Sequence, residues 1–338
     1  MEPITHFLTG AVLGRTGFNR KTALATATMM LAAEAPDLDI FWRFKGPVYY
    51  FAHHRGFTHS FLGLLLMSAL TIAVVYLVWR LRGRKTNIPD LPPRWGRLFL
   101  LAYIAGLSHI LLDFTNNYGV RPFWPFWGKS YSWDIVFIVE PALYIFLIGG
   151  LVVPLIFSRR EARGHAAIGA LLCVVILYGV RDYEHRAAVK VVRASTFENN
   201  SVSQKPQRAS VYPYPWSITH WYAVAEMPGF FASTDVDSRT GILNRDLLEF
   251  YPQPPETPVT RVAKQSYLGR VFLNWAQYPL VTEAASGQNT SVHFRDLRFE
   301  LPQRRGGVAL LSGWVEVGPD LQIIGEGFGS RKQNPPLK

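Results

Sequence analysis

Cysteine is almost absent from this sequence. The 338 residues include a single one, Cys173, which stands inside an apolar run. One cysteine per chain excludes an internal disulfide framework and a structural zinc site of the CxxC kind. Without a set of thiolates, a transition-metal site would be built from imidazole and carboxylate groups, a donor set that suits zinc, manganese or iron.

Charged residues are also scarce. They make up 17% of the chain, against roughly 25% in an average soluble domain. The shortage lies in the first 180 residues, which are filled with long apolar stretches, whereas the remainder has an ordinary soluble composition. This asymmetry predicts a membrane-embedded helical N-terminal half and a globular C-terminal half. The first residues also lack a basic region and a small-residue cleavage site, so no cleavable signal peptide is expected.

Positive charge is in excess, with a net charge of +11. Residues 1–180 contain 17 Lys/Arg and 9 Asp/Glu, which gives +8, and residues 181–338 contain 18 and 15, which gives +3. A basic balance can indicate a nucleic-acid partner. Here the excess lies beside apolar stretches, which favours membrane topology and contact with anionic lipid headgroups, and no nucleic-acid partner is expected. The sequence does not determine an oligomeric state.

Four apolar stretches are candidates for membrane spans, each of which needs about 20 apolar residues. Residues 61–79 and 98–114 fit best. Residues 135–157 form a third candidate that is interrupted at Glu140, where the carboxylate is expected to fill a kink before a proline. Residues 165–180 form a short fourth candidate.

Two shorter apolar segments come first, at residues 4–14 and 22–35. They predict a helical hairpin that either dips into the bilayer or crosses it twice. Such a hairpin puts three basic loops on one side of the membrane, which should be the cytoplasmic side. These loops are residues 15–21, 80–97 and 158–164. Residues 36–60, residues 115–132 and the C-terminal domain would then lie on the extracytoplasmic side.

Ionisable residues gather at segment ends on that expected outer side. Five of the nine histidines precede residue 110, and all five lie at such ends. The group comprises His6, Asp37, Asp39, His53, His54, Arg55, His59, His109 and Asp113. Ionisable groups are costly inside a membrane, so they usually face a cavity or a partner there.

Local spacing shows how these groups can share a ligand. His109 and Asp113 are four residues apart, which places both on one face of a helix. Asp37 and Asp39 flank a leucine after a proline, so both carboxylates can point to one side. His54 and His59 span a loop that contains a glycine. Taken together, the set favours a metal site.

Each motif has a simpler interpretation when taken alone. His109 and Asp113 could satisfy each other, and the PDLD segment at residues 36–39 could be an ordinary turn. Arg55 could bind a phosphate or carboxylate through its fork of donors, anchor a lipid headgroup, or pair with Asp37. None of these alternatives accounts for several imidazole and carboxylate clusters at one interface.

The combined pattern resembles a known family. His6, PDLD at 36–39, HRGFTHS at 54–60 and SHILLD at 108–113 resemble the YdjM-like family of LexA-regulated, inner-membrane, metal-dependent hydrolases. The resemblance covers about residues 1–180 and implies a multi-span protein of the bacterial inner membrane. Carried over residue by residue, it implies these metal ligands: His6, Asp37, Asp39, His54, His59, His109 and Asp113.

These observations predict a membrane-bound hydrolase that uses one or two divalent ions, with zinc expected and manganese or iron as alternatives. Seven candidate ligands exceed the three or so of a mononuclear catalytic site. Asp39 could therefore remain free as a general base, and Arg55 would orient an anionic group. A site at the bilayer surface suits a phosphodiester or ester substrate, including a membrane lipid. The alternatives are a metal-binding entry site for transport and a structural scaffold of His/Asp pairs.

The C-terminal part predicts a small β-rich domain of about five to seven strands. Residues 181–216 are expected to form a helix extension and a linker, and residues 217–330 the domain itself. Residues 318–320 are expected to form the turn of a hairpin. No catalytic motif is recognisable, which favours a covering or partner-binding module. The expected strands are residues 218–226, 229–233, 266–274, 291–300, 308–317 and 321–327.

Overall fold

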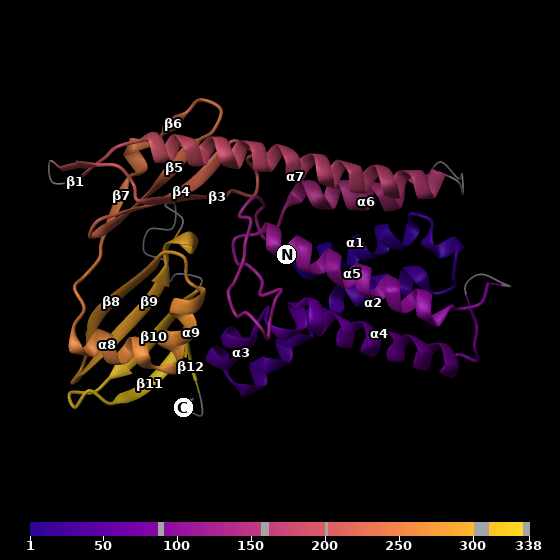
Figure 1. Ribbon diagram of the computed structural model, residues 1–338, viewed down its shortest axis with the longest axis horizontal. Coiled ribbons are helices and arrows are strands. Elements are labelled where there is room, and N and C mark those ends of the chain that lie inside the picture. Colours follow the sequence, from indigo (N-terminus) through magenta and orange to yellow (C-terminus); the bar gives the residue numbers. More distant parts are fainter. Residues whose placement is uncertain (87–90, 157–161, 200–201, 301–310, 334–338) are drawn as a thin grey trace. The chain divides into compact units, whose positions relative to one another are not determined.

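The computed structural model describes residues 1–86, 91–156, 162–199, 202–300 and 311–333. The chain forms two compact units (Figure 1). The first comprises Met1–Asp39 and Arg55–Arg181, and the second comprises Ile40–His54 and Asp182–Lys338. The short segment Ile40–His54 therefore belongs with the C-terminal part of the chain, although its sequence neighbours belong to the helical unit.

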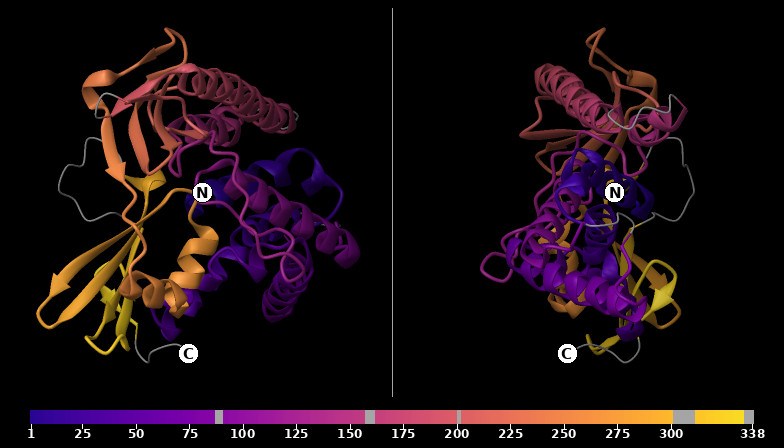
Figure 2. Two further views of the ribbon diagram at one scale, coloured as in Figure 1. Left: turned by 60° about the vertical axis from the view of Figure 1, so that its left-hand side comes forward. Right: turned by 90° about the vertical axis from the view of Figure 1, so that its right-hand side faces the viewer.

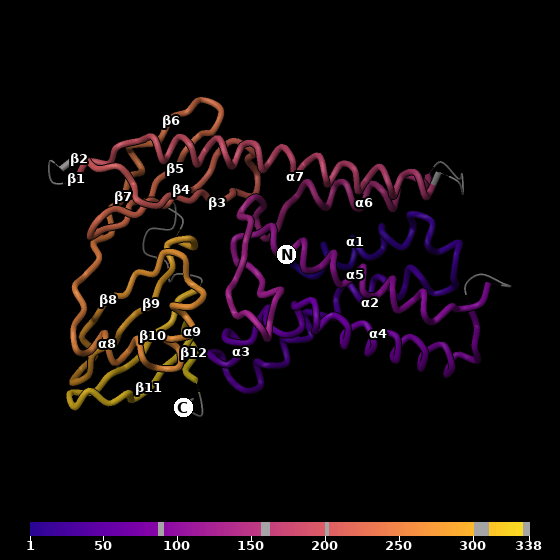
Figure 3. Tube along the Cα trace, in the orientation of Figure 1, coloured from indigo at the N-terminus to yellow at the C-terminus, as the bar shows by residue number. Residues whose placement is uncertain are grey.

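The first unit is helical, as the sequence predicts. Its longest described connection joins α5 to α6, and its path can be followed in Figure 3. The helices are α1 (Pro3–Arg15), α2 (Ala25–Glu34), α4 (Phe61–Leu81), α5 (Trp95–Thr115), α6 (Pro141–Ile156) and α7 (Ala162–Ala194), with 3-10 helices η1 (Phe18–Arg20), η2 (Ala35–Lys45) and η3 (Phe57–His59). Both η2 and α7 continue into the second unit.

Three described helices are long and apolar enough to cross a bilayer, namely α4, α5 and the part of α7 from Arg163 to Ala194. The expected spans at residues 61–79 and 98–114 correspond to α4 and α5. The third expected span begins later than predicted, because α6 begins only at Pro141; the last expected residue, Phe157, lies outside the described part of the chain. The fourth is longer, because α7 runs on without interruption to Ala194.

The two N-terminal helices pack closely, as the predicted hairpin requires. Gly10 and Gly14 of α1 face α2, where a Cβ atom added at Gly10 would lie 2.5 Å from the Met29 carbonyl oxygen. One added at Gly14 would lie 2.6 Å from the Thr26 Cα. Small residues four apart allow two helix backbones to approach in this way. The end of α2 is thereby held against the helices that carry the site.

Local sequence also fixes the approach to α4 and the contact between α4 and α5. The Ser60 hydroxyl accepts a hydrogen bond from the Gly63 amide at 2.9 Å and caps the N-terminus of α4. Gly106 of α5 lets Leu64 of α4 come so close that an added Cβ would lie 2.8 Å from it. His59, one residue before the cap, is therefore held beside α5.

A buried ion pair lies within the helical unit. Glu140 lies just before α6 and its carboxylate contacts the Arg181 guanidinium of α7 at 2.6 Å, with both side chains almost fully enclosed. The expected structural role for Glu140 is consistent with this contact. The pair satisfies two charges that would otherwise be costly at this position.

The second unit is built from two antiparallel five-stranded sheets and a small β1–β2 hairpin. In the first sheet the strands lie in the order β3-β4-β5-β6, and β7 also pairs with β5; in the second the order is β12-β11-β10-β9-β8. Helices α8 and α9 pack on the second sheet (Figure 2). The bounds are β1 (Phe197–Asn199), β2 (Val202–Gln204), β3 (Arg208–Pro213), β4 (His220–Met227), β5 (Phe230–Asp237), β6 (Ile242–Leu243), β7 (Glu249–Pro252), α8 (Pro258–Gln265), α9 (Tyr267–Trp275), β8 (Pro279–Ser286), β9 (Asn289–Asp296), β10 (Ser312–Val317), β11 (Ile323–Phe328) and β12 (Arg331–Lys332), with 3-10 helices η4 (Arg245–Leu247) and η5 (Leu297–Phe299).

Several predictions for this unit were wrong. Residues 266–274 form the helix α9 rather than a strand, because Leu268, Phe272 and Trp275 recur at helical spacing and are all buried. Ser266 caps this helix by accepting a hydrogen bond from the Gly269 amide at 2.9 Å. The expected linker contains β3, and the described strands exceed the five to seven predicted. The hairpin of β10 and β11 is confirmed.

The segment Ile40–His54 is fixed in the second unit by direct contacts. Its helix α3 (Pro47–His53) places the Phe51 ring on that of Phe328, with centroids 4.3 Å apart. The Gln333 side chain accepts a hydrogen bond from the Val48 amide at 3.0 Å and donates one to the Lys45 carbonyl at 2.8 Å. These contacts explain why the chain leaves the helical unit after Asp39 and returns to it at Arg55.

Candidate metal centre

Four of the predicted ligands converge in the helical unit. Asp37 comes from η2, His59 from η3, and His109 and Asp113 from α5. Each offers one ligand atom, and the four atoms lie within 4.8 Å of one another. The residues are separated by as many as 76 positions in the sequence, so only the packing of η2 and η3 against the end of α5 brings them together.

The distances between these atoms match those around a single metal ion. His59 Nε2 lies 3.4 Å from Asp37 Oδ1 and 3.4 Å from Asp113 Oδ2. His109 Nε2 lies 3.6 and 3.4 Å from the same two oxygens, and the two Nε2 atoms are 3.0 Å apart. Ligands at the usual zinc distances occupy the corners of a tetrahedron whose edges are about 3.3 Å. Five of the six edges are therefore close to the required length.

Contacts outside the group orient both imidazoles. The His109 Nδ1 atom lies 2.6 Å from the Ala33 carbonyl oxygen, to which it donates a hydrogen bond. The His59 Nδ1 atom lies 3.0 Å from the Thr58 hydroxyl and 3.5 Å from Asp39 Oδ2. In both rings the Nε2 atom is thereby directed toward the carboxylates. A hydrogen bond at one ring nitrogen that fixes the other as a ligand is usual in metal sites.

Burial differs between the four residues. The side chains of His59, His109 and Asp113 are fully enclosed, whereas that of Asp37 is 25% exposed. Asp37 therefore lies at the accessible side of the group. Of the four, it is the residue that a ligand arriving from outside would meet.

The pKa values of His59 and Asp37, which lie outside the candidate membrane spans, are shifted by their neighbours in the group. Burial by itself would lower the pKa of His59, but the nearby carboxylates of Asp113, Asp37 and Asp39 raise the pKa of His59 to about 9. Burial would raise the pKa of Asp37, but the hydrogen bond from His59 and the charges of His109 and His59 hold it well below its usual value. The nearby carboxylates account for the raised pKa of His59, and the nearby imidazoles account for the lowered pKa of Asp37.

His6 lies beside the group rather than in it. Its ring stacks on that of His109 with centroids 3.6 Å apart, and its Nε2 atom lies 3.4 Å from Asp113 Oδ1. Within the described part of the chain, neither ring nitrogen of this fully buried histidine makes a hydrogen bond. The α-amino group of Met1 pairs with the same carboxylate oxygen. His6 therefore faces the side of Asp113 that points away from His59.

Arg55 also contacts this side of Asp113, with its Nη2 atom 2.9 Å from Oδ1. The sequence left a pairing with Asp37 among the alternatives, and the ion pair that the structure shows is with Asp113. The side chain is only 4% exposed, which also differs from a lipid-headgroup anchor at the surface. Its backbone has φ +54°, which is uncommon for a residue other than glycine and turns the chain back into the helical unit.

Two further predicted residues have different surroundings. Asp39 is buried and accepts a hydrogen bond from the Arg55 amide at 2.8 Å, so it lies behind His59 rather than among the four atoms. His54 is not part of the four-residue group; it belongs to the other unit, where its ring stacks on that of Tyr50 at 4.9 Å. His53 likewise contacts its own helix, with Nδ1 2.9 Å from the Tyr49 carbonyl oxygen.

The sequence reasoning missed Asn116. This residue follows α5 directly and is fully buried, and its Oδ1 atom accepts a hydrogen bond from Arg55 Nη1 at 3.1 Å. Its position three residues after Asp113, in a stretch that reads DFTNNYG, is the one feature that could have drawn attention to it.

Comparison with known proteins gives a match to the N-terminal part of the chain. Residues 1–187 match the YdjM inner membrane protein family. The chain belongs to this family. The predicted resemblance is thus confirmed, and with it a place among inner-membrane proteins. This YdjM family member is also 24% identical over 332 residues to the protein YfhP of Bacillus subtilis, covering 96% of the present chain and 93% of that protein. No solved structure matches the chain.

Proposed function

We propose that this YdjM family member is a membrane-bound hydrolase that uses one divalent cation. The observation that carries the proposal is the set of distances between Asp37, His59, His109 and Asp113, which fit one tetrahedral ion. Arg55 occupies the other side of Asp113, so the donor set supports one ion better than two. Zinc suits these donors, with manganese and iron as the alternatives.

The fully enclosed residues would be the permanent ligands. Two histidines and one carboxylate, here His59, His109 and Asp113, are a common catalytic set that leaves a position open. Asp37 borders that position and is partly exposed, so it would complete the tetrahedron in the resting site and act as the general base once water takes its place. A divalent ion bound there would supply Lewis acidity and lower the pKa of water to roughly 7. Asp39 would keep the His59 ring in place.

The substrate is proposed to be a phosphodiester or an ester at the bilayer surface, including a membrane lipid. Two observations support this. The four-residue group lies next to the first residues of α4, an apolar helix long enough to span a bilayer, and the exposed residues of that helix are apolar over most of its length. The basic loops at residues 15–21, 80–97 and 158–164 favour an extracytoplasmic site.

The test compares two histidine variants of the full chain in detergent. Zinc would be measured by elemental mass spectrometry in the wild type, in His59→Ala and in the matched control His54→Ala. We expect about one equivalent in the wild type and in the control, and none above background in His59→Ala, since only His59 belongs to the four-residue group.

Activity would be measured on the same samples with bis(p-nitrophenyl) phosphate and p-nitrophenyl acetate. Turnover that disappears with the metal supports the hydrolase. A wild type that holds no metal after reconstitution with zinc, manganese or iron would overturn the proposal and leave a structural role for the His/Asp pairs. Bound metal without turnover of either ester would instead favour a non-catalytic metal-binding protein.

A further inference from the structure

Two buried hydrogen-bond donors near the candidate metal centre lack an acceptor among the described residues. The Arg55 Nε atom and the Asn116 Nδ2 atom are both enclosed, and within the described residues neither makes a hydrogen bond. Arg55 is 4% exposed and Asn116 is not exposed at all. An enclosed donor without an acceptor is costly, and more so when it carries charge, so native proteins seldom keep one without a reason.

The orientation of Asn116 follows from its other contacts. Its Oδ1 atom accepts from Arg55 Nη1 at 3.1 Å and from the Tyr118 amide at 2.9 Å. Both neighbours are donors, so the oxygen must lie toward them and the NH₂ group on the opposite side. The two unused donors thus belong to side chains that are bonded directly to each other.

The same pair is joined to the metal centre. Arg55 Nη2 lies 2.9 Å from Asp113 Oδ1, and the other oxygen of Asp113 belongs to the proposed ligand set. The guanidinium also lies over the Tyr118 ring, 4.9 Å from its centroid, which holds its plane. Arg55 is therefore placed by contacts on several of its atoms while Nε keeps an N–H to donate.

We propose that Arg55 Nε and Asn116 Nδ2 form an oxyanion subsite that binds the phosphoryl group of the substrate. The inference rests on the proposed hydrolase and decides between its two substrate classes. A guanidinium and an amide suit the charged oxygens of a phosphodiester, whereas a carboxylic ester carries no charge to match an enclosed cation. Because Arg55 contacts Asp113 of the four-residue group, the oxygen bound here would be close to the metal and the scissile bond rather than on a distant headgroup.

The experiment titrates inorganic phosphate into the zinc-loaded full chain in detergent, by isothermal calorimetry. Asn116→Asp keeps an oxygen for Arg55 and Tyr118 but removes the NH₂ donors. We expect this variant to bind phosphate about ten- to a hundredfold more weakly, with an unchanged zinc content. The control Asn117→Asp adds the same charge one residue further along and should retain most of the affinity. Arg55→Lys, which keeps the positive charge but lacks Nε–H and the fork, should also lose phosphate.

Three results would separate the possible failures. Zinc-loaded protein that binds no phosphate overturns the subsite and leaves the metal site standing. Equal phosphate affinities of Asn116→Asp and Asn117→Asp also overturn the subsite. The added charge would then account for any loss of affinity, and the NH₂ group of Asn116 would have no part in it. A wild type that holds no metal overturns the proposed function, and with it this inference. Preferential turnover of bis(p-nitrophenyl) phosphate over p-nitrophenyl acetate, reduced in Asn116→Asp, supports the phosphoryl assignment.

Discussion

Asp296 in the β-rich unit and Asp113 in the helical unit are both buried, but they differ in their hydrogen-bond partners. Asp296 in the β-rich unit is 1% exposed and accepts hydrogen bonds from the Gln277, Tyr278 and Arg298 amides at 2.8, 3.3 and 3.0 Å. The Arg298 guanidinium completes its shell at 2.8 Å. Asp113 in the helical unit is fully enclosed as well, yet among the described residues its Oδ2 atom has no hydrogen-bond partner and faces Nε2 atoms at 3.4 Å.

This difference distinguishes a carboxylate that stabilises the fold from one that is available to bind a ligand. A buried charge with a complete set of hydrogen bonds stabilises the arrangement around it. A buried charge with spare acceptor capacity, surrounded by imidazoles at slightly long distances, is stable only if something else occupies the space between them. The helical unit therefore carries the candidate chemistry, and the β-rich unit does not show a comparable group within the residues that the structure describes.

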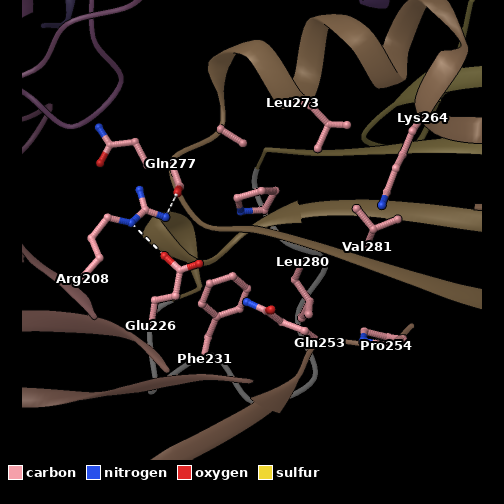
Figure 4. A pocket seen from close by; sticks show the side chains of 12 residues that line it. Arg208, Glu226, Phe231, Gln253, Pro254, Lys264, Leu273, Gln277, Leu280 and Val281 are labelled. Atoms are coloured by element: carbon pink, nitrogen blue, oxygen red, sulfur yellow. Dashed lines mark hydrogen bonds and ion pairs between the residues drawn. The ribbon is translucent and has the colours of Figure 1, made fainter. Parts of the chain in front are cut away.

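A pocket of about 510 Å³ in the β-rich unit shows the same contrast (Figure 4). Arg208 reaches into it, but its guanidinium contacts Glu226 at 2.9 Å and the Gln277 carbonyl oxygen at 2.5 Å. Lys264, also in its lining, contacts Glu256 at 3.0 Å. Each of these two cations is matched by a carboxylate of the same unit, so this pocket gives no reason to place a ligand in it.

The sharpest test of the comparison substitutes Asp113. Asp113→Asn keeps the shape of the side chain but removes the charge that a cation requires. Zinc affinity should fall by more than the roughly 10- to 100-fold loss that is typical of a residue outside the ligand set. Competition with a chelator of known affinity would measure it. Stoichiometric zinc in a folded Asp113→Asn protein would show that Asp113 is no ligand.

The corresponding change in the other unit is Asp296→Asn. Its loss leaves the Arg298 guanidinium, which is 2% exposed, without its partner, and breaking a buried pair costs about 3–5 kcal/mol. Hydrogen exchange followed by mass spectrometry should show faster exchange over β8 and β9. The zinc content should not change. Loss of zinc in this variant would mean that the two aspartates are not separate in function.

A third buried carboxylate, Asp39, is intermediate between a metal ligand and a purely structural group. It lies 3.5 Å from His59 Nδ1 and accepts a hydrogen bond from the Arg55 amide. Asp39→Asn preserves an acceptor for that amide but weakens the orientation of the His59 ring. We expect a 10- to 100-fold loss of zinc affinity. An effect as large as that of Asp113→Asn would make Asp39 a ligand, and an unchanged affinity would make it a backbone cap alone.

The pH dependence follows from the His59 proton. Because the pKa of His59 is raised to about 9 in the metal-free protein, the ring is protonated at neutral pH and a cation must displace that proton. Zinc affinity should therefore rise about tenfold per pH unit up to roughly pH 9. For the metal-free fold the sign is reversed: the raised pKa stabilises it fully below the unfolded value of about 6.5, and this contribution disappears as the pH rises through 9.

Chelator competition between pH 6 and 9 would measure the affinity, and thermal unfolding of the metal-free protein the stability. His59→Ala, which is expected to hold no zinc, should abolish the pH dependence of the stability. A zinc affinity that is constant over this range would contradict the raised pKa, while the control His54→Ala should behave as the wild type does.

The smallest effect is expected at the rim of the pocket in Figure 4. The Arg208 side chain is 46% exposed and that of Glu226 is 29% exposed, so solvent screens their ion pair. Arg208→Ala should lower the free energy of unfolding of the β-rich unit by no more than about 1 kcal/mol. Urea denaturation of the solubilised chain would check this value. A loss of stability comparable to that of Asp296→Asn would show that side-chain exposure does not predict how much an ion pair of this unit contributes to stability.

Much of the helical unit could be read from the sequence. Apolar runs of about 20 residues predicted α4 and α5. Because His109 and Asp113 are four residues apart, they were expected on one face of α5. The family resemblance, which was read from motifs in these segments, was confirmed by the match over residues 1–187. The β-rich unit was harder, since a short apolar run such as residues 266–274 fits either a strand or a helix until Leu268, Phe272 and Trp275 are recognised as one face.

By itself, the sequence determined which residue types were available and which helices could lie in a membrane, because hydrophobicity and helical periodicity are local properties. Only the tertiary structure decided which of two nearby histidines joins the candidate site. His54 and His59 have the same chemistry, but the chain between Asp39 and Arg55 packs in the other unit, and His54 goes with it. Asn116 was invisible for the same reason: a buried donor without a partner is a property of its surroundings and not of its neighbours in the sequence.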